Sequence, residues 1–277
     1  MTNGADRRPV HVTADVVSAK RIGAFTHLTL RASGISERFR PGTFVALSHG
    51  ADRSLLARRA LWIHRVRTAS AYGPCLDVVV DPVGTTTRWL AGLAVGASLE
   101  LTGPLGRPFA LPQEPVPCLL VGEGVDAAAL FPLAERLRER GCPVHLLLGA
   151  EREDRLLSAL EARRTVRAVT VMTADGSVGL RGSVADRVAE SVRSSSAAVV
   201  YAAGSHATLR AAASAAVEQG AWSQVLVTPS MPCGTGLCHG CAVPVIAEHG
   251  AARTVRGCTE GPVFRGDRVR WDAMEVR

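Results

Sequence analysis

Hydrophobic and polar positions alternate with a period of two along the first part of the chain. The runs HVTADVV, THLTLRA, FVALSH and LDVVVDPV follow this alternation, and Gly and Pro turns separate them. Such runs are typical of antiparallel strands with one buried face. We therefore expect a small antiparallel β-barrel, of the FAD-binding type, over residues 1–112. A short helix at TTTRWLAGL interrupts it, with a threonine cap at its start and a stop near Gly96.

The pattern changes over residues 113–223, where short apolar runs alternate with segments of helical period. The expected buried strands are CLLVG, VHLLLGA, RAVTVMTA and AAVVYAAG. The expected helices are AAALFPLAERLRERG, DRLLSALEARR, SVADRVAESVRS and ATLRAAASAAVEQG. Strands that alternate with helices predict an α/β domain of the nucleotide-binding type, with a parallel sheet covered on both faces.

The last segment, residues 224–277, has a different composition, with a strand followed by a loop rich in Cys and Gly. A hairpin is expected at AVPVIAEHGAARTVRG and a final strand at RVRWD. The predicted fold is therefore mixed: a barrel, a parallel-sheet domain and a small C-terminal cluster subdomain.

Composition narrows the classes of function. No apolar run approaches the roughly 18 residues of a membrane span, and MTNGADRRPV lacks the apolar core of a signal peptide, so we expect a cytoplasmic protein. The net charge of +7 comes from dispersed arginines, and aromatic residues make up only 4%. This distribution argues against nucleic-acid binding, although a positive surface could dock an acidic protein partner.

Seven cysteines in a cytoplasmic protein are better read as thiols than as disulfides. Three of them are scattered core thiols: Cys75, Cys118 and Cys142. The other four form a C-x4-C-x2-C pattern with one distant partner: Cys233, Cys238, Cys241 and Cys258. This is the plant-type 2Fe–2S spacing, and the glycines between the thiols let backbone N–H groups approach sulfur. A zinc site and unligated thiols are the alternatives.

With these motifs in place, the chain resembles the electron-transfer subunit of the two-subunit bacterial dihydroorotate dehydrogenase, in the ferredoxin-reductase superfamily. The resemblance covers almost the whole chain. It rests on FRPGTFVAL, LARRALWIHRV, VVVDPVGTTTRWLAGL, TGPLGRPFALP, LLVGEGV, TADGSVGLRGSVAD, VVYAAGS, SMPCGTGLCHGCAVPV and RGCTEGPVFRGDRVRW. It implies that NAD(P)H reduces FAD, that a 2Fe–2S cluster takes the electrons singly, and that an FMN-containing catalytic subunit or another redox protein is the partner in a hetero-oligomer.

The resemblance assigns a flavin site to two segments. The family motif Arg-Pro-x-Ser, in which arginine meets the diphosphate and serine donates a hydrogen bond, reads here Arg59-Ala60-Leu61-Trp62, and Ile63 and His64 follow. The family's Gly-x-Gly-Thr turn reads Gly84-Thr85-Thr86-Thr87, which keeps the first glycine and the threonine. Trp62 replaces the serine hydroxyl, and the Thr86 side chain replaces the second glycine. The alternative is that Arg59 is a surface arginine and that Thr87 caps the TRWLAGL helix.

The resemblance assigns the nicotinamide site to glycines after two strands: Gly122, Gly124 and Gly204. Glu123 and Asp126 stand near the first of these turns, where a helix N-terminus ordinarily favours phosphate. Ala203 replaces the cysteine that precedes Gly204 in the family. Alternatively, the two carboxylates serve as partners of a helix dipole.

Three hypotheses of function follow. The first is the family role, an electron-transfer subunit with FAD and a 2Fe–2S cluster. The second is a cluster-only electron carrier or adaptor whose nucleotide pocket is degenerate. The third is a repurposed scaffold that binds another ligand or performs non-redox chemistry beside a structural cluster. The terminal acceptor and the choice between NADH and NADPH are not encoded in any residue that we can identify.

Overall fold

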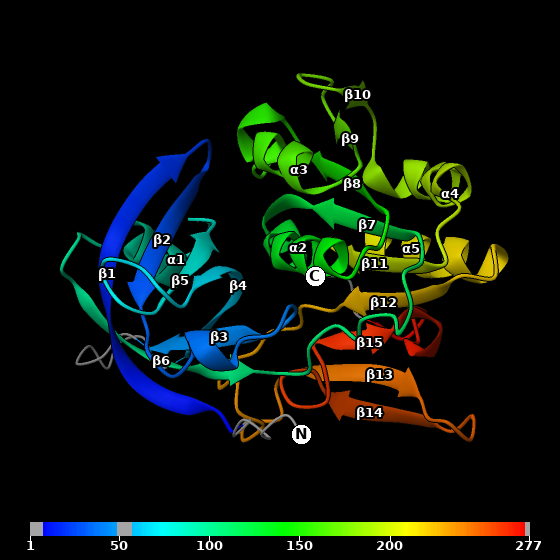
Figure 1. The fold of residues 1–277 in the computed structure, drawn as a ribbon. Helices are drawn as coiled ribbons and strands as arrows, with labels where there is room; N and C mark the ends of the chain where they lie inside the picture. Colours follow the sequence, from blue (N-terminus) through cyan, green and yellow to red (C-terminus); the bar gives the residue numbers. More distant parts are fainter. Residues whose placement is uncertain (1–7, 49–56, 275–277) are drawn as a thin grey trace.

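The structure is a computed structural model that describes residues 8–48 and 57–274. Most of the segment used for the leader prediction, and the end of the run FVALSH, lie outside the described residues. A barrel lies on one side and a layered sheet domain on the other, and a two-stranded hairpin lies beneath the sheet (Figure 1).

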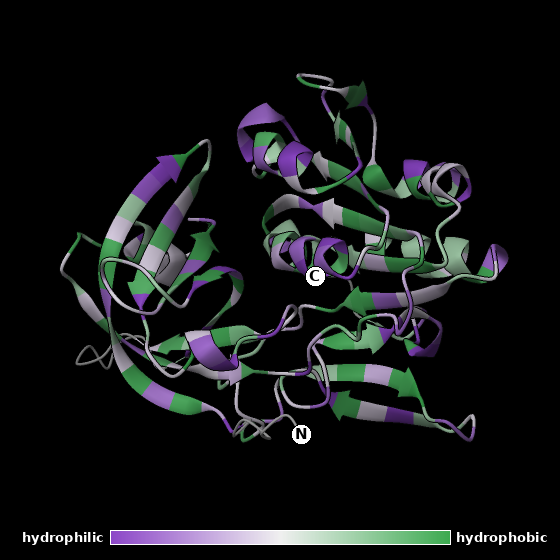
Figure 2. Cartoon of the chain, in the orientation of Figure 1, coloured by the Kyte–Doolittle hydropathy of each residue, from purple (hydrophilic) through white to green (hydrophobic). Residues whose placement is uncertain are grey.

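The first domain is a closed antiparallel barrel with strand order β1-β2-β5-β4-β3-β6. Its strands are β1 (Val10–Ile22), β2 (Phe25–Arg31), β3 (Phe44–Ser48), β4 (Arg59–Arg67), β5 (Cys75–Val80) and β6 (Ser98–Leu105). Along β6 the burial alternates residue by residue, and Figure 2 shows the corresponding alternation of hydropathy on the barrel strands. The expected barrel is therefore confirmed, because one face of each strand supplies its core.

Two short helices accompany the barrel, η1 (Ser36–Arg38) and α1 (Thr85–Ala91). The N-cap of α1 is Gly84, so the expected threonine cap is wrong in position. Thr87 bonds back to the cap from the third helical position: its Oγ1 accepts from Gly84 N at 2.9 Å and donates to Gly84 O at 3.2 Å. A hydroxyl one turn inside the helix thus satisfies an N-terminal donor.

The second domain is a seven-stranded sheet with the order β10-β9-β8-β7-β11-β12-β15. Its strands are β7 (Cys118–Glu123), β8 (Val144–Ala150), β9 (Ala168–Thr173), β10 (Leu180–Arg181), β11 (Val199–Ala203), β12 (Trp222–Leu226) and β15 (Val263–Arg265). All neighbours pair in parallel except β12 and β15, which are antiparallel. The expected parallel sheet is confirmed.

Helices cover both faces of this sheet. One face is packed by η2 (Gly124–Leu130), α2 (Phe131–Glu139) and α3 (Ala159–Thr165), and the other by α4 (Val184–Ser195) and α5 (His206–Glu218). The short helix η3 (Glu153–Arg155) has no buried residue. Helix α4 begins at Ser183, whose hydroxyl accepts from Asp186 N. Its buried Val184, Val188 and Val192 recur at helical spacing, as the sequence predicts.

Two helices differ from expectation. The segment AAALFPLAERLRERG begins as the 3-10 helix η2 and becomes α-helical only at Phe131, with Pro132 in the first turn. Proline is favoured at that position because its missing N–H has no helical partner there. The segment DRLLSALEARR splits into η3 and α3 at Ser158, which has a φ of 44°. The extended Leu156 ends η3, and the left-handed Ser158 is the N-cap from which α3 begins.

The C-terminal segment combines the hairpin β13 (Ala242–Ile246) and β14 (Ala252–Arg256) with the short helix η4 (Gly266–Arg268). The expected final strand at RVRWD is wrong: the last strand is β15, which lies earlier, and only Val269 forms an isolated bridge, to Val245. The chain leaves the sheet at Gly266 because η4 packs on α5 there. No helix among the described residues has the length and apolarity needed to cross a membrane.

Candidate metal centre and the interdomain crevice

The four clustered thiols come together in one place and form two pairs. Cys233, Cys238 and Cys241 lie in the loop between β12 and β13, and Cys258 lies just after β14. The Cys241 and Cys258 sulfurs are 3.2 Å apart, and the Cys233 side chain interacts with that of Cys238. Each iron of a two-iron cluster takes two protein ligands, so this pairing fits a 2Fe–2S cluster.

A site for a single metal ion would need several ligands around one position. Among the described residues, no group of three or more Cys, His, Asp or Glu side chains converges on one ion position. The support for a two-iron cluster comes from the arrangement of the four thiols in two pairs. The remaining cysteines, Cys75, Cys118 and Cys142, are buried elsewhere in the core, as expected.

Backbone N–H groups surround the outer pair of sulfurs. Cys233 Sγ accepts from Thr235 N at 3.4 Å and from Cys238 N at 3.5 Å, and Cys238 Sγ accepts from Gly240 N at 3.4 Å. Burial raises the pKa of the Cys233 thiol, but the donors of Cys238 and Thr235 outweigh it and lower that pKa to about 6. A loop that stabilises thiolate is prepared to ligate a metal.

The inner pair has a drier environment. Cys241 and Cys258 are each 1% exposed. Burial, together with the neighbouring Cys241 thiol, raises the pKa of Cys258 to about 12. Without metal the Cys258 thiol is therefore protonated near pH 7, and metal binding must displace its proton.

Two glycines in the loop have backbone conformations that other residues rarely adopt. Gly234 has a φ of 68° and Gly236 a φ of 86°. A Cβ on Gly236 would stand 2.9 Å from Thr259 Cγ2, and one on Gly234 would stand 3.0 Å from Ala46 Cβ. The loop thus packs against both the barrel and the segment that carries Cys258, and only glycine permits that approach.

The thiol loop is held by hydrogen bonds from neighbouring elements. Arg58 N donates to Pro232 O at 2.8 Å, which ties the loop to the start of β4. Gly257 N donates to Cys241 O at 2.7 Å, and the Arg256 guanidinium donates to Gly236 O at 3.1 Å. The loop therefore has contacts with the barrel and with the hairpin.

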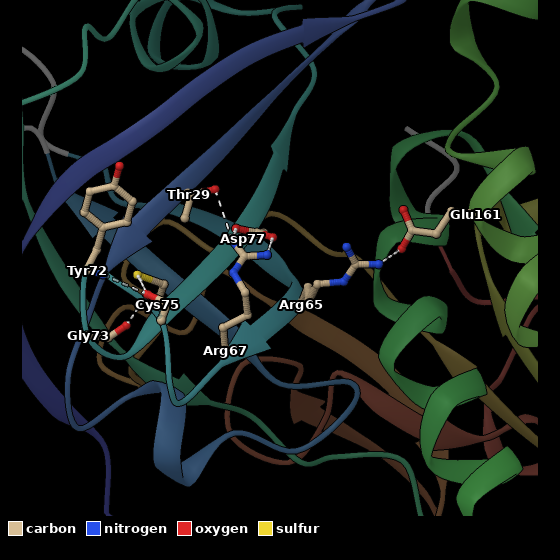
Figure 3. Close-up of polar contacts among 9 residues, drawn as sticks. Thr29, Arg65, Arg67, Tyr72, Gly73, Cys75, Asp77 and Glu161 are labelled. Carbon is tan, nitrogen blue, oxygen red and sulfur yellow. Dashed lines mark hydrogen bonds and ion pairs between the residues drawn. The ribbon is translucent and has the colours of Figure 1, made fainter.

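Ion pairs join the barrel to the sheet domain along the crevice between them. Arg65 on β4 reaches Glu161 on α3, and the neighbouring Arg67 binds Asp77 within the barrel at 2.7 Å (Figure 3). Arg155 on η3 likewise pairs with Asp81 on the barrel side. A backbone bond, Ala24 N to Asp154 O at 2.7 Å, adds a third link. These contacts set the relative position of the two domains.

The residues assigned to the flavin diphosphate line a cavity in this crevice. The cavity has a volume of 290 Å³. It is lined by Ala57, Arg58, Arg59, Ala60, Val83, Gly84, Thr85, Thr86, Thr87, Thr228, Pro229, Ser230, Met231 and Pro232. Arg59, Gly84, Thr86 and Thr87 thus lie together, and Arg59 supplies an exposed positive charge. Thr87 also bonds back to the Gly84 cap of α1, so the alternative interpretation is right about its contact with the helix start but not about the cap residue.

Trp62 occupies the interface itself and is 7% exposed. Its indole Nε1 donates to Asp126 Oδ1, in η2 of the sheet domain, at 2.6 Å. Its ring meets Phe44 edge to face at a centroid distance of 5.9 Å. Burial raises the pKa of the Asp126 carboxyl, an effect that the bond from Trp62 and the charge of Arg59 oppose. The indole therefore bridges the two domains.

Ile63 and His64 follow Trp62 but lie in packed surroundings. Ile63 is fully buried in the barrel core. His64 is buried between the domains, with its Nδ1 3.2 Å from Ala128 O and its ring 4.9 Å from that of Phe131. Burial lowers the pKa of His64 to about 4, so the ring is neutral near pH 7. Both side chains contribute packing here.

The residues assigned to the nicotinamide site lie at the carboxyl ends of neighbouring strands β7 and β11. Gly122 lies near the end of β7, Gly124 follows the strand with a φ of 58°, and Gly204 follows β11. A Cβ on Gly204 would stand 2.7 Å from Glu123 Cβ, so glycine is needed where the two strands approach. The crevice at the carboxyl ends is the usual ligand position in such sheets.

Glu123 binds the amino end of α5. Its Oε2 accepts from Ser205 N at 3.0 Å and from the Thr208 hydroxyl at 2.7 Å. The carboxylate is thus a helix-dipole partner, but of a helix 82 residues away and not of η2. It takes donors that an incoming phosphate would otherwise use.

A second cavity, of 490 Å³, extends from these strand ends to the thiol loop. Its walls are Asp126, Gly204, Ser205, His206, Leu209, Val227, Thr228, Pro229, Ser230, Gly240, Ala242, Pro244, Thr254, Ala273 and Met274. The segment Thr228–Pro229–Ser230 lines both cavities. Sequence reasoning missed it, although its position directly after a sheet strand is a signal for a ligand-facing loop.

Comparison with known proteins begins with a family model, the iron-sulfur cluster binding domain of dihydroorotate dehydrogenase B, which matches residues 228–270. A solved structure described as an NADH-dependent reduced ferredoxin-NADP oxidoreductase is 28% identical with a TM-score of 0.80, over 94% of this chain and 90% of that one. The ferredoxin reductase of carbazole 1,9a-dioxygenase, at 20% identity and a TM-score of 0.62, covers 77% of this chain and 67% of its own and shares the fold.

Relatives with curated descriptions cover nearly the full length. The dihydroorotate dehydrogenase B electron transfer subunit of Desulforamulus reducens is 30% identical over 84% of this chain and 87% of its own. The Geobacillus kaustophilus subunit is 32% identical over 92% and 96%. The homologue from Thermotoga maritima is 32% identical over 90% and 84%. With the barrel, the parallel sheet and the paired thiols, this similarity means that the chain belongs to the family of dihydroorotate dehydrogenase B electron transfer subunits.

Proposed function

We propose that this chain is an electron-transfer subunit that passes electrons between a pyridine nucleotide, FAD, a 2Fe–2S cluster and a partner flavoprotein of the dihydroorotate dehydrogenase type. The family and the ferredoxin-reductase-like fold imply these redox groups. The single observation that carries the proposal is the set of four thiols, paired two by two in one place between barrel and sheet. We place the subunit in the cytoplasm, where its seven free thiols stay reduced.

The cluster fits the residues that are present. Cys233 and Cys238 would hold one iron, and Cys241 and Cys258 the other. When bound, the cluster supplies one-electron transfer. The N–H groups of Thr235, Cys238 and Gly240 stabilise negative charge on sulfur, which tunes the potential of such a centre.

The two thiol pairs differ in exposure, and this supports a direction for electron flow. Cys241 and Cys258 face the interior, whereas Cys238 is exposed and the adjacent Leu237 is 82% exposed. A partner protein can therefore approach the outer pair, while the inner pair lies in the buried core. Docking at this edge is part of the proposal, as is the hetero-oligomer with a catalytic subunit.

The nucleotide groups fit only in part. The 290 Å³ cavity offers Arg59 and the start of α1 to a diphosphate. Trp62 stands where the family has a serine, and its indole is held across the crevice. At the second cavity Glu123 holds the donors of α5. The chain's own residues therefore support the cluster fully and FAD at its diphosphate end, whereas Glu123 opposes the phosphate of a pyridine nucleotide.

Trp62 and Glu123 favour a second candidate, the cluster-only electron carrier. In that function electrons enter and leave through partner proteins, and the crevice serves only to hold the domains together. The two side chains support it because each fills, with the chain's own atoms, a position that a nucleotide would use.

The test is anaerobic purification followed by iron, sulfide and flavin analysis. Iron and acid-labile sulfide in equal amounts, with reduction of the centre by one electron, support electron transfer by a 2Fe–2S cluster. Bound flavin that NADH reduces supports the full family role, and cluster without flavin supports the second candidate. Zinc in place of iron, with no sulfide, contradicts both.

A further inference from the structure

Trp62 is the side chain through which barrel and sheet meet at the centre of the crevice. It belongs to a buried hydrophobic cluster that contains barrel residues such as Phe44, η2 residues such as Ala127, and the inner thiols. Its single polar atom is satisfied by Asp126 at 2.6 Å. An aromatic residue with its N–H bonded and its ring packed has a fixed position.

Asp126 is held from several sides. It receives the indole N–H, lies near the Arg59 charge and interacts with the Thr228 hydroxyl, while the Glu123 carboxylate repels it. Arg59 comes from the barrel, and Thr228 comes from the loop that lines both cavities. The indole and the carboxylate thus lie where the barrel, the sheet and the thiol loop meet.

The crevice contains two cavities, one lined by Asp126 and the other by Arg59. The smaller cavity, 290 Å³, is at the lower limit of the roughly 300–1,000 Å³ typical of ligand pockets, and FAD is among the larger ligands. Asp126 lines only the larger cavity and Arg59 only the smaller. The smaller cavity can take a nucleotide phosphate, but a flavin ring that continues toward the sheet domain meets the indole.

We propose that the Trp62 indole, held by Asp126, is an internal occupant of the ring end of the flavin crevice, which keeps the domains docked without FAD and admits the ring only when this contact opens. The inference rests on the proposed function, because it concerns the flavin site of the family. It makes Trp62 the residue that determines whether this chain is a flavoprotein.

FAD affinity of matched variants tests the proposal, measured by titration of flavin fluorescence and by calorimetry on the full chain with its cluster. Trp62→Ser removes the ring and restores the hydroxyl of the family motif, and Trp62→Phe keeps an aromatic ring but loses the donor. We expect Trp62→Ser to bind FAD about tenfold or more tightly than wild type, because the ring that fills the flavin position is removed. Trp62→Phe should stay within about threefold of wild type, since its ring still fills the space.

Trp222→Phe is the control. This tryptophan begins β12, at the amino end of the sheet strands and thus away from the crevice. Its replacement should leave FAD affinity unchanged. If Trp62→Ser does not fold without FAD but folds with it, ligand linkage supports the proposal. If it folds in neither condition, Trp62→Leu, which keeps an apolar contact in a smaller volume, takes its place.

Three results overturn the inference. One is wild-type protein that keeps FAD one-to-one through gel filtration. Another is Trp62→Ser or Trp62→Leu with no gain in FAD affinity. The third is a gain in FAD affinity for Trp62→Phe that equals the gain for Trp62→Ser, which would mean that the volume of the ring does not limit FAD binding. Iron and sulfide content is measured in every variant, so that failure of this inference can be told from failure of the proposed function. Wild-type protein without a cluster would contradict the proposed electron transfer, but the FAD affinities of the variants could still be compared.

Discussion

Replacement of Glu123 by glutamine tests the contact between β7 and the amino end of α5. The Glu123 carboxylate accepts from Ser205 N at 3.0 Å and from the Thr208 hydroxyl at 2.7 Å. Glutamine has the same size and keeps one oxygen acceptor, but it has no charge. The change therefore isolates the electrostatic part of the contact.

Two effects of opposite kind follow from the loss of charge. Hydrogen bonds to charged groups stabilise by about 1.5–3 kcal/mol and neutral ones by about 0.5–1.5, and the helix dipole adds about 0.3–1 kcal/mol. Because Glu123 is half-buried, we expect the free energy of unfolding to fall by about 2 kcal/mol. Conversely, the phosphate of a dinucleotide no longer meets a carboxylate. Repulsion between two unit charges at 4 Å is about 1–4 kcal/mol, so we expect NADH to bind about tenfold more tightly at low salt.

Urea unfolding and NADH titration at two salt concentrations measure both effects. Glu218→Gln is the matched control, because Glu218 is exposed and lies at the opposite end of the same helix. It should leave NADH affinity unchanged and should not lower stability, since a carboxylate at a helix C-terminus is unfavourable. An unchanged unfolding midpoint in Glu123→Gln refutes the capping argument, and unchanged NADH affinity at low salt refutes the electrostatic one.

Three further changes probe the cluster and the domain interface. Cys258→Ser should abolish the cluster absorption and sulfide content, whereas Cys75→Ser, in the barrel, should leave both intact; a cluster that survives Cys258→Ser contradicts the four-thiol assignment. His64 has a pKa of about 4 in the folded protein against an ordinary value of about 6.5, so its contribution is complete above pH 6.5 and is lost as pH falls toward 4. His64→Phe should remove up to about 3 kcal/mol of that pH dependence in urea unfolding, and parallel curves for the two proteins would disprove the assignment. Asp126 has a raised pKa, which disfavours the folded state above the ordinary carboxylate pKa; Asp126→Asn should flatten the decline of stability with rising pH, and an unchanged slope would show that the carboxylate is hydrated.

Local patterns predict much of this structure. The barrel strands, the parallel strands and helix α4 follow from alternation and from caps such as Ser183, because neighbours in sequence decide them. The four thiols are equally predictable, since three lie within one short loop and only Cys258 has to be brought in. The sequence offers Thr87 two roles, a flavin contact or a cap, and its position allows it to be both a cap and a cavity wall.

Contacts between distant segments cannot be predicted in this way. Trp62 and Asp126 are 64 residues apart, and Glu123 and Ser205 are 82 residues apart. In the sequence Glu123 and Asp126 look like one pair of charges, but the fold turns one toward α5 and the other toward the barrel. The direction of each side chain depends on the packing of β7 beside β11 and of η2 against β4, which no local pattern contains.

The antiparallel pairing of β12 and β15 has a consequence for how the metal centre is assembled. Leu226 pairs with Val263, and Val227 N donates to Pro262 O at 2.9 Å, so these strands close a loop that contains all four thiols. The entropy of closing that loop is therefore overcome by sheet formation and not by iron. A zinc finger, by contrast, gathers its ligands only when metal arrives. We therefore expect the sheet to keep the ends of the thiol loop together when the cluster is removed, so that the chain can be loaded with iron and sulfide again.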